Sequence, residues 1–256
     1  MKLQIKKAYS FGAILLLALG AATIAAAVMS SLSAESADET AARRYQSYLL
    51  ADELRQSSDD LTRLARTYVA TGDAKWETQY FEILDIRNGK KPRPQGYERI
   101  YWDFRAAGAE SVRPTGESVP LLDLMKRAGF AENELAKLAE AKANSDDLVR
   151  TETIAMNMVK GLYDDGKGGF TRQAEPDKAK ALTMMHDLAY HQYKAKIMKP
   201  VDEFLVLLDQ RTSGELASAI SARQNWSRVA MATTASLIVL MVSGLLYLRR
   251  RTSAVL

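Results

Sequence analysis

The chain has 256 residues, of which 47 % are hydrophobic and 26 % charged, a composition typical of a folded protein with one or two domains. It contains no cysteine and only two histidines, which excludes disulfides, thiol nucleophiles and cysteine-ligated metals. The formal net charge of +4 comes from three lysines before residue 31 and three arginines after residue 228; the residues between hold 29 basic and 31 acidic side chains, so the charge balance does not predict nucleic-acid binding.

Two uncharged apolar segments flank the central part of the chain, at residues 9–30 and 229–248. Because about 20 residues of helix cross a bilayer core of about 30 Å, both segments are predicted to be transmembrane helices. Each has a basic cluster on its terminal side, and the positive-inside rule places such clusters in the cytoplasm. The sequence therefore predicts cytoplasmic tails at residues 1–8 and 249–256 and an extracytoplasmic domain at residues 31–228.

The first segment has a second interpretation as a cleaved signal peptide. A signal peptide carries an apolar region of about 7–15 residues, and this segment is longer. Ala18, Ala22 and Ala26 lie one helical turn apart, as small residues do where membrane helices pack. The length and the alanine spacing favour a retained anchor.

The extracytoplasmic domain is predicted to be all-α. Residues typical of strands are sparse, and glycines follow several periodic apolar segments, as they do at helix C-termini. The expected helices cover residues 33–71, 74–87, 97–107, 119–128, 131–160 and 176–226, with a loop at 88–96 and a glycine-rich turn at 161–170. The last helix carries an apolar stripe that includes Leu182, Met185, Tyr193, Ile197 and Phe204. Since the first helix leaves the membrane and the last returns to it, we expect an antiparallel up-down bundle between two transmembrane helices.

Several segments of this domain resemble a helical sensor domain of bacterial transmembrane receptors. They are LRQSSDDLTRLARTYVATGD (54–73), ILDIRNGKKPRP (83–94), IYWD (100–103), LLDLMKRAGF (121–130) and ELAKLAEAKANSDDLV (134–149). The resemblance covers about residues 45–210 and is to methyl-accepting chemotaxis proteins, sensor histidine kinases and diguanylate cyclases. It implies a homodimeric receptor of the bacterial inner membrane that takes part in chemotaxis or another form of signal transduction, such as a two-component system. Such a receptor detects a small ligand or a periplasmic binding protein.

The sequence departs from that pattern after the second apolar segment. Receptors of this kind continue into a HAMP linker and an output module, whereas this sequence stops at RRRTSAVL (249–256). Two interpretations follow: a truncated receptor whose tail begins a HAMP helix, or an accessory or structural two-span protein with a helical scaffold. An enzyme is not expected, because no nucleophile–base pair and no cofactor loop is present, and we predict no catalytic residue, cofactor or metal site.

Candidate ligand-binding residues gather on the first long helix. Arg63 and Arg66 are three residues apart and so lie near one face, and a guanidinium holds a carboxylate with two parallel hydrogen bonds. Asp59 can satisfy Arg63 within the helix, while Arg66 has no acidic residue at 62, 63, 69 or 70. Ser58 and Tyr68 are predicted to add polar contacts. The alternative is a solvated ladder of ion pairs between residues four apart.

A short repeat extends this site to a second helix. Residues 58–63 and 145–150 share the pattern S-D-D-L-x-R, which indicates a duplicated helical unit. Asn144 and Arg150 are therefore predicted to form the opposite wall of a pocket for a small anionic or amino-acid-like ligand. Tyr101 and Trp102 are predicted to be packing residues.

Overall fold

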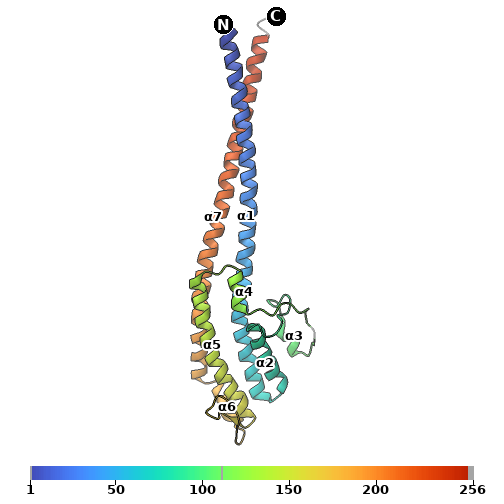
Figure 1. Cartoon of the computed structure of the whole chain (residues 1–256), viewed down its shortest axis with the longest axis vertical. Helices are drawn as coiled ribbons and strands as arrows, with labels where there is room; N and C mark the ends of the chain where they lie inside the picture. The colour runs from blue at the N-terminus through green and yellow to red at the C-terminus, as the bar shows by residue number, and fades with distance from the viewer. Residues whose placement is uncertain (1, 111, 253–256) are drawn as a thin grey trace. The chain divides into compact units, whose positions relative to one another are not determined.

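The computed structural model describes residues 2–110 and 112–252, and it is 78 % helical (Figure 1). The chain is therefore mostly α-helical, as predicted. Of the predicted tail at residues 249–256, the last four residues lie outside the described part. The elements in chain order are α1 (Lys2–Thr71), α2 (Ala74–Arg87), α3 (Trp102–Ala106), α4 (Leu121–Arg127), α5 (Glu132–Val159), β1 (Leu162–Tyr163), β2 (Arg172–Gln173), α6 (Lys178–Met184) and α7 (Leu188–Thr252).

The turn between α1 and α2 follows directly from its sequence. Gly72 has a φ of +75°, a conformation that glycine adopts without a steric penalty, and its N–H donates to the Tyr68 carbonyl at 2.7 Å. Asp73 then caps α2 by accepting a hydrogen bond from the Lys75 N–H at 3.0 Å. The predicted bounds of α2 are confirmed.

The predicted helix at residues 97–107 is wrong in length, because only Trp102–Ala106 is helical. The preceding residues form turns in which Tyr97 and Tyr101 are buried beside Trp102. Burial of these aromatic rings outweighs the helical preference of the segment. The predicted helix at 119–128 is confirmed in a shorter form as α4, which begins after Pro120.

The single helix predicted at residues 176–226 is also wrong, since α6 and α7 are separate helices. The backbone turns at residues 185–187, and the Asp187 carboxylate accepts from the Tyr190 N–H at 2.8 Å, which caps the start of α7. The glycine-rich turn before α6 is a small hairpin in which β1 and β2 pair antiparallel, with Leu162 opposite Gln173.

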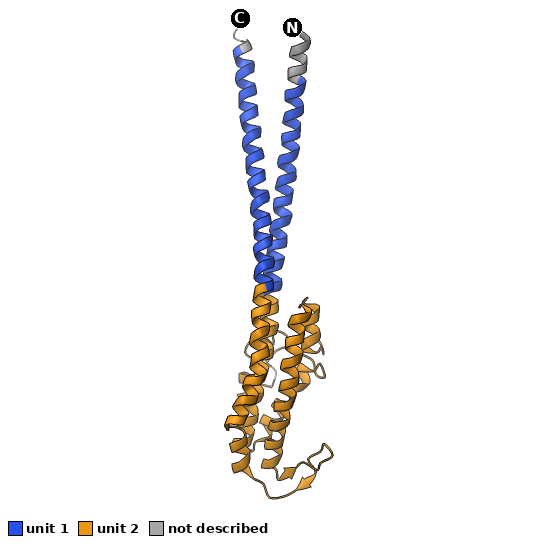
Figure 2. Ribbon diagram, turned by 90° about the vertical axis from the view of Figure 1, so that its left-hand side faces the viewer, with its two compact units in different colours: residues 1–44, 211–256 blue, residues 45–210 orange. Residues whose placement is uncertain are grey.

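The chain divides into two compact units (Figure 2). Unit 1 comprises residues 1–44 and 211–256, and unit 2 comprises residues 45–210. Helix α1 contributes to both units, as does α7.

Unit 1 contains the two apolar segments. Among the described residues, two helices, α1 and α7, have a stretch long and apolar enough to cross a membrane. Only 6 % of the first stretch and none of the second is buried, whereas a core helix of a soluble protein is mostly buried. The side chains of Leu17 and Val239, for example, are 75 % and 65 % exposed. This exposure supports a membrane-associated chain with two candidate spans.

Unit 2 has a large apolar core. One cluster joins α1, α2, α5, α6 and α7 through buried residues such as Leu64, Ile83, Met156 and Ile197. A second cluster lies around α4, where Phe130 and Phe204 stack with ring centroids 5.6 Å apart. Since each fully buried large apolar side chain contributes about 1.5–3 kcal/mol, this core holds together the helices that carry the polar groups described below.

Candidate functional site

The two predicted arginines of α1 are both engaged by nearby groups. Arg63 donates from Nη2 to Oδ1 of Asp60 at 2.8 Å, so its partner is Asp60 rather than Asp59. Arg66 donates from Nε to the carbonyl of Met185 at 2.9 Å, and its guanidinium carbon lies 4.8 Å from the centre of the Tyr190 ring. Both arginines are half-buried. The sequence did not indicate the contacts of Arg66, because both of its partners are more than a hundred residues away.

The other predicted residues lie in several places in unit 2. Ser58 accepts hydrogen bonds from Lys194 of α7, and Tyr68 is buried with the ammonium of Lys160 5.7 Å from its ring. Asn144 donates from Nδ2 to the Lys196 carbonyl at 3.1 Å, and Arg150 lies 3.6 Å from the Asp164 carboxylate. Ser58 and Arg66 thus contact the residues of one network, which is described next, whereas Tyr68, Asn144 and Arg150 contact other groups.

At the centre of this network is the buried carboxylate of Glu152 on α5, a residue only 1 % exposed. Tyr80 of α2 donates to its Oε2 at 2.7 Å, and Tyr190 of α7 donates to its Oε1 at 2.6 Å. The Tyr190 hydroxyl also lies 3.1 Å from Oγ1 of Thr62 on α1. Burial raises the pKa of Glu152, and the two tyrosine hydrogen bonds oppose that effect. Glu152 therefore links three other helices of unit 2.

Lys194 extends the network from α7 to α1. Its ammonium donates to the carbonyl and to the hydroxyl of Ser58, each at 2.8 Å, and lies 3.0 Å from Oδ1 of Asp59. Burial lowers the pKa of Lys194, against the opposing effect of Asp59. All the donors of this ammonium are therefore directed at groups of α1.

A second buried cation lies on α2. Arg87 is only 7 % exposed; it donates from Nη1 to Oγ of Ser145 at 3.1 Å, and its Nη2 lies 3.7 Å from Oδ1 of Asp146. Burial lowers the pKa of Arg87, against the opposing effect of Asp146. Ser145 and Asp146 belong to the second copy of the short sequence repeat, so that copy provides the polar partners of Arg87.

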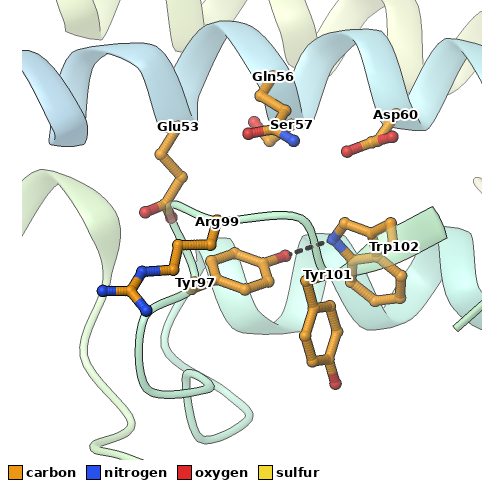
Figure 3. A pocket seen from close by; sticks show the side chains of 8 residues that line it. All are labelled: Glu53, Gln56, Ser57, Asp60, Tyr97, Arg99, Tyr101 and Trp102. Carbon is orange, nitrogen blue, oxygen red and sulfur yellow. Dashed lines mark hydrogen bonds between the residues drawn. The ribbon is translucent and has the colours of Figure 1, made fainter. Parts of the chain in front are cut away.

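A separate polar hollow lies between α1 and the segment before and within α3 (Figure 3). Its volume of about 10 Å³ is close to the smallest that can hold one water molecule. Three aromatic rings line it, and they meet edge to face: Tyr97 and Tyr101 at 5.4 Å between ring centroids, and Tyr101 and Trp102 at 5.0 Å. Trp102 donates from Nε1 to the Tyr97 hydroxyl at 2.7 Å. Tyr101 and Trp102 are buried, as predicted for packing residues.

The α1 side of the hollow is polar. Glu53, Gln56, Ser57 and Asp60 line it, and Figure 3 shows the Asp60 carboxylate directed toward the aromatic rings. Glu53 forms an ion pair with Arg93. Asp60 uses Oδ1 for Arg63, whereas its Oδ2 is buried and has no hydrogen-bond partner. Burial raises the pKa of Asp60, and the Arg63 hydrogen bond opposes that effect.

Sequence reasoning missed Glu152, Tyr190 and Lys194, and it missed the hollow. The stripe assigned to the last helix included Tyr193, which is 43 % exposed, whereas Tyr190 is 1 % exposed. Both tyrosines lie on α7, and the face of this helix that is buried runs through Tyr190, Ile197 and Phe204 rather than through Tyr193. A signal was nevertheless present, because Ile197 and Tyr190 are seven residues apart and so lie on one helical face.

Within residues 2–110 and 112–252, no group of three or more acidic or histidine side chains is arranged to hold a metal ion. Comparison of the chain with known proteins finds no match among protein families, curated proteins or solved structures.

Proposed function

We propose that this chain is the sensory part of a two-span bacterial membrane receptor, in which unit 2 detects a periplasmic ligand or binding protein. The observation that carries the proposal is that helices α1 and α7 each contain both an apolar stretch suited to a membrane and residues of the buried network. The network residues are Ser58 and Thr62 on α1 and Tyr190 and Lys194 on α7. A change in that network is therefore a change in the helices that enter the membrane.

The same proposal covers the topology and the partners. Both termini are cytoplasmic, residues 31–228 are periplasmic, and the periplasmic helices form an antiparallel up-down bundle. The receptor is a homodimer, because the membrane raises the effective concentration of two weakly pairing copies. The sequence resemblance supports this, since it covers about residues 45–210, which are also the residues of unit 2. The chain senses and does not catalyse; its output is chemotactic or another signalling response.

A reporter experiment tests the topology. A reporter fused after residue 256 is expected to be active only in the cytoplasm, and one inserted within residues 88–96 only in the periplasm. The opposite pattern would overturn the proposal.

A cross-linking experiment tests the transmission of a signal. Because the chain has no cysteine, Leu19→Cys and Ser236→Cys, which line one groove between α1 and α7 in unit 1, provide a clean reporter pair. Lys194→Gln removes the charge that the network uses to hold α1, and it is expected to change the rate of disulfide formation between the two cysteines. Lys196→Gln, on an exposed position of the same helix, is the matched control.

The two outcomes separate the two interpretations of the sequence. A changed rate for Lys194→Gln alone supports a sensor whose buried network is coupled to its membrane helices. Equal rates for Lys194→Gln, Lys196→Gln and the parent pair favour an accessory or structural two-span protein.

A further inference from the structure

The Asp60 carboxylate has one oxygen for which the described chain provides no partner. Oδ1 accepts from Arg63 at 2.8 Å, while Oδ2 is buried and accepts no hydrogen bond. A buried acceptor without a donor costs about 1–3 kcal/mol. The missing partner is a donor that fits the hollow beside Asp60, and Figure 3 shows the space between this carboxylate and the aromatic rings.

The surroundings of Oδ2 favour a positively charged donor. Tyr97, Tyr101 and Trp102 line the hollow, and aromatic rings attract cations through the negative potential of their faces. A second carboxylate, that of Glu53, lies in the same lining but is paired with Arg93. The carboxylate oxygen of this lining that is open to a cation is therefore Oδ2 of Asp60.

The volume limits what can enter. About 10 Å³ holds one small polar group, such as a water molecule or an ammonium group, and nothing larger. Water can donate to Oδ2 but brings no charge, whereas an ammonium group donates and also compensates the carboxylate. We propose that this hollow binds the ammonium group of a small organic amine, with the remainder of the molecule outside it.

Arg99 lies where that remainder would be. It lines the hollow, its side chain is 72 % exposed, and its Nε lies 3.9 Å from Oε1 of Glu98. An exposed guanidinium is screened by water and so opposes a bound amine only weakly. It would, however, hold the carboxylate of an amino acid whose ammonium group is at Asp60. The effect of Arg99 therefore distinguishes a simple amine from an amino acid.

The binding test uses the full chain in detergent with a single tryptophan as the reporter. Trp76→Phe and Trp226→Phe together leave Trp102, which lines the hollow, as the one tryptophan. Titration with methylammonium chloride is expected to change the Trp102 emission with saturation, while sodium chloride and tetramethylammonium chloride at equal ionic strength do not. Tetramethylammonium serves as the control because it is charged but has no N–H to donate.

Two substitutions assign the binding to the hollow. Asp60→Asn keeps an oxygen for Arg63 but removes the charge, and it is expected to weaken methylammonium binding about tenfold or more. Asp52→Asn, on an exposed position of the same helix, should bind as the parent does. Gln56→Lys places an ammonium group of the chain itself beside the hollow and is expected to abolish binding, and circular dichroism checks that each variant is folded.

The amino-acid form of the ligand is tested with glycine. Arg99→Gln is expected to strengthen methylammonium binding slightly; it weakens glycine binding if the ligand is an amino acid. If the Trp102 emission responds equally to sodium chloride, or if both Asp60→Asn and Gln56→Lys bind methylammonium as the parent does, the hollow holds water only and the inference is wrong.

The inference rests on the proposed sensory function, since that function makes the bound amine a signal. The experiments can nevertheless contradict the binding site and the sensory function separately. Methylammonium binding that leaves the Leu19–Ser236 cross-linking rate unchanged would retain the site and remove its sensory role. A cross-linking rate that responds to Lys194→Gln, without any methylammonium binding, would do the reverse.

Discussion

Burial raises the pKa values of two carboxylates of unit 2, those of Glu152 and Asp60, but their hydrogen bonds differ. Glu152 accepts hydrogen bonds from two tyrosines, one on each oxygen. Asp60 has Arg63 on one oxygen and no hydrogen-bond partner on the other. A buried carboxylate with a hydrogen-bond donor of the chain on each oxygen belongs to the framework of the fold. A carboxylate that lies beside a hollow and has a donor on only one oxygen can accept a hydrogen bond from a bound molecule.

The largest expected effect comes from Glu152→Ala. Loss of this side chain leaves the hydroxyls of Tyr80 and Tyr190 buried without an acceptor and removes the negative charge near Lys194, so we expect a loss of about 3–5 kcal/mol of unfolding free energy. Chemical denaturation of the full chain in detergent measures it. The control is Glu140→Ala, an exposed position of α5, for which we expect a change within about 0.5 kcal/mol. Equal losses of unfolding free energy for Glu152→Ala and Glu140→Ala would contradict a structural role of Glu152.

Tyr190→Phe is expected to have the next largest effect. It keeps the ring beside Arg66 but removes the donor to Glu152, so the loss of unfolding free energy should be about 1–3 kcal/mol. Tyr193→Phe serves as the control, because Tyr193 is 43 % exposed. A thermal unfolding midpoint that is the same for both variants would contradict the central role of Tyr190.

The pH dependence of stability provides a third test. The pKa of Glu152 is raised in the folded chain above its ordinary value of 4.5, so the folded state holds the proton to higher pH than the unfolded state does. Glu152 therefore reduces the free energy of unfolding as pH rises through 4.5 toward its folded pKa. Glu152→Gln is expected to remove this contribution, which gives a flatter dependence of stability on pH across that window. An unchanged slope would show that Glu152 has an ordinary pKa.

The smallest effect is expected from Asp60→Asn. Asparagine keeps an acceptor for Arg63, whose side chain is 37 % exposed, so the change in unfolding free energy without added amine should be within about 1 kcal/mol. Chemical denaturation of Asp60→Asn and of Glu152→Ala under the same conditions compares the two losses of unfolding free energy. A loss as large as that of Glu152→Ala would make Asp60 part of the framework too.

The part of the fold that the sequence predicted depends on local chemistry. Helix α2 has the predicted bounds because Gly72 and Asp73 fix its start, and Asn88 and Gly89 fix its end. The part that it did not predict depends on tertiary contacts. The turns before α3 exist because Tyr97 and Tyr101 are buried with Trp102, a gain that no local pattern displays.

The candidate site divides in the same way. The sequence offered Asp59 as the ion-pair partner of Arg63, whereas the structure pairs Arg63 with Asp60, because both residues lie within one helical turn of it. Arg66 had no acidic neighbour in sequence, and its partners come from the other end of unit 2. Its role as a ligand contact stays a prediction, as do those of Arg63, Ser58, Tyr68, Asn144 and Arg150.

The break before α7 has a mechanical consequence. It exposes the Met185 carbonyl to Arg66, and Lys194 on the following helix reaches back to Ser58. Met185 belongs to the turn before α7, and positions 58 and 66 are eight residues, or about 12 Å, apart along α1, so the turn and α7 are attached to α1 at two separate heights. These hydrogen bonds are 2.8–2.9 Å long and are lost beyond about 3.5 Å. Within unit 2, a movement of α7 that carries the Lys194 ammonium away from Ser58 therefore breaks one attachment, while the turn at residues 185–187 can remain hydrogen-bonded to Arg66.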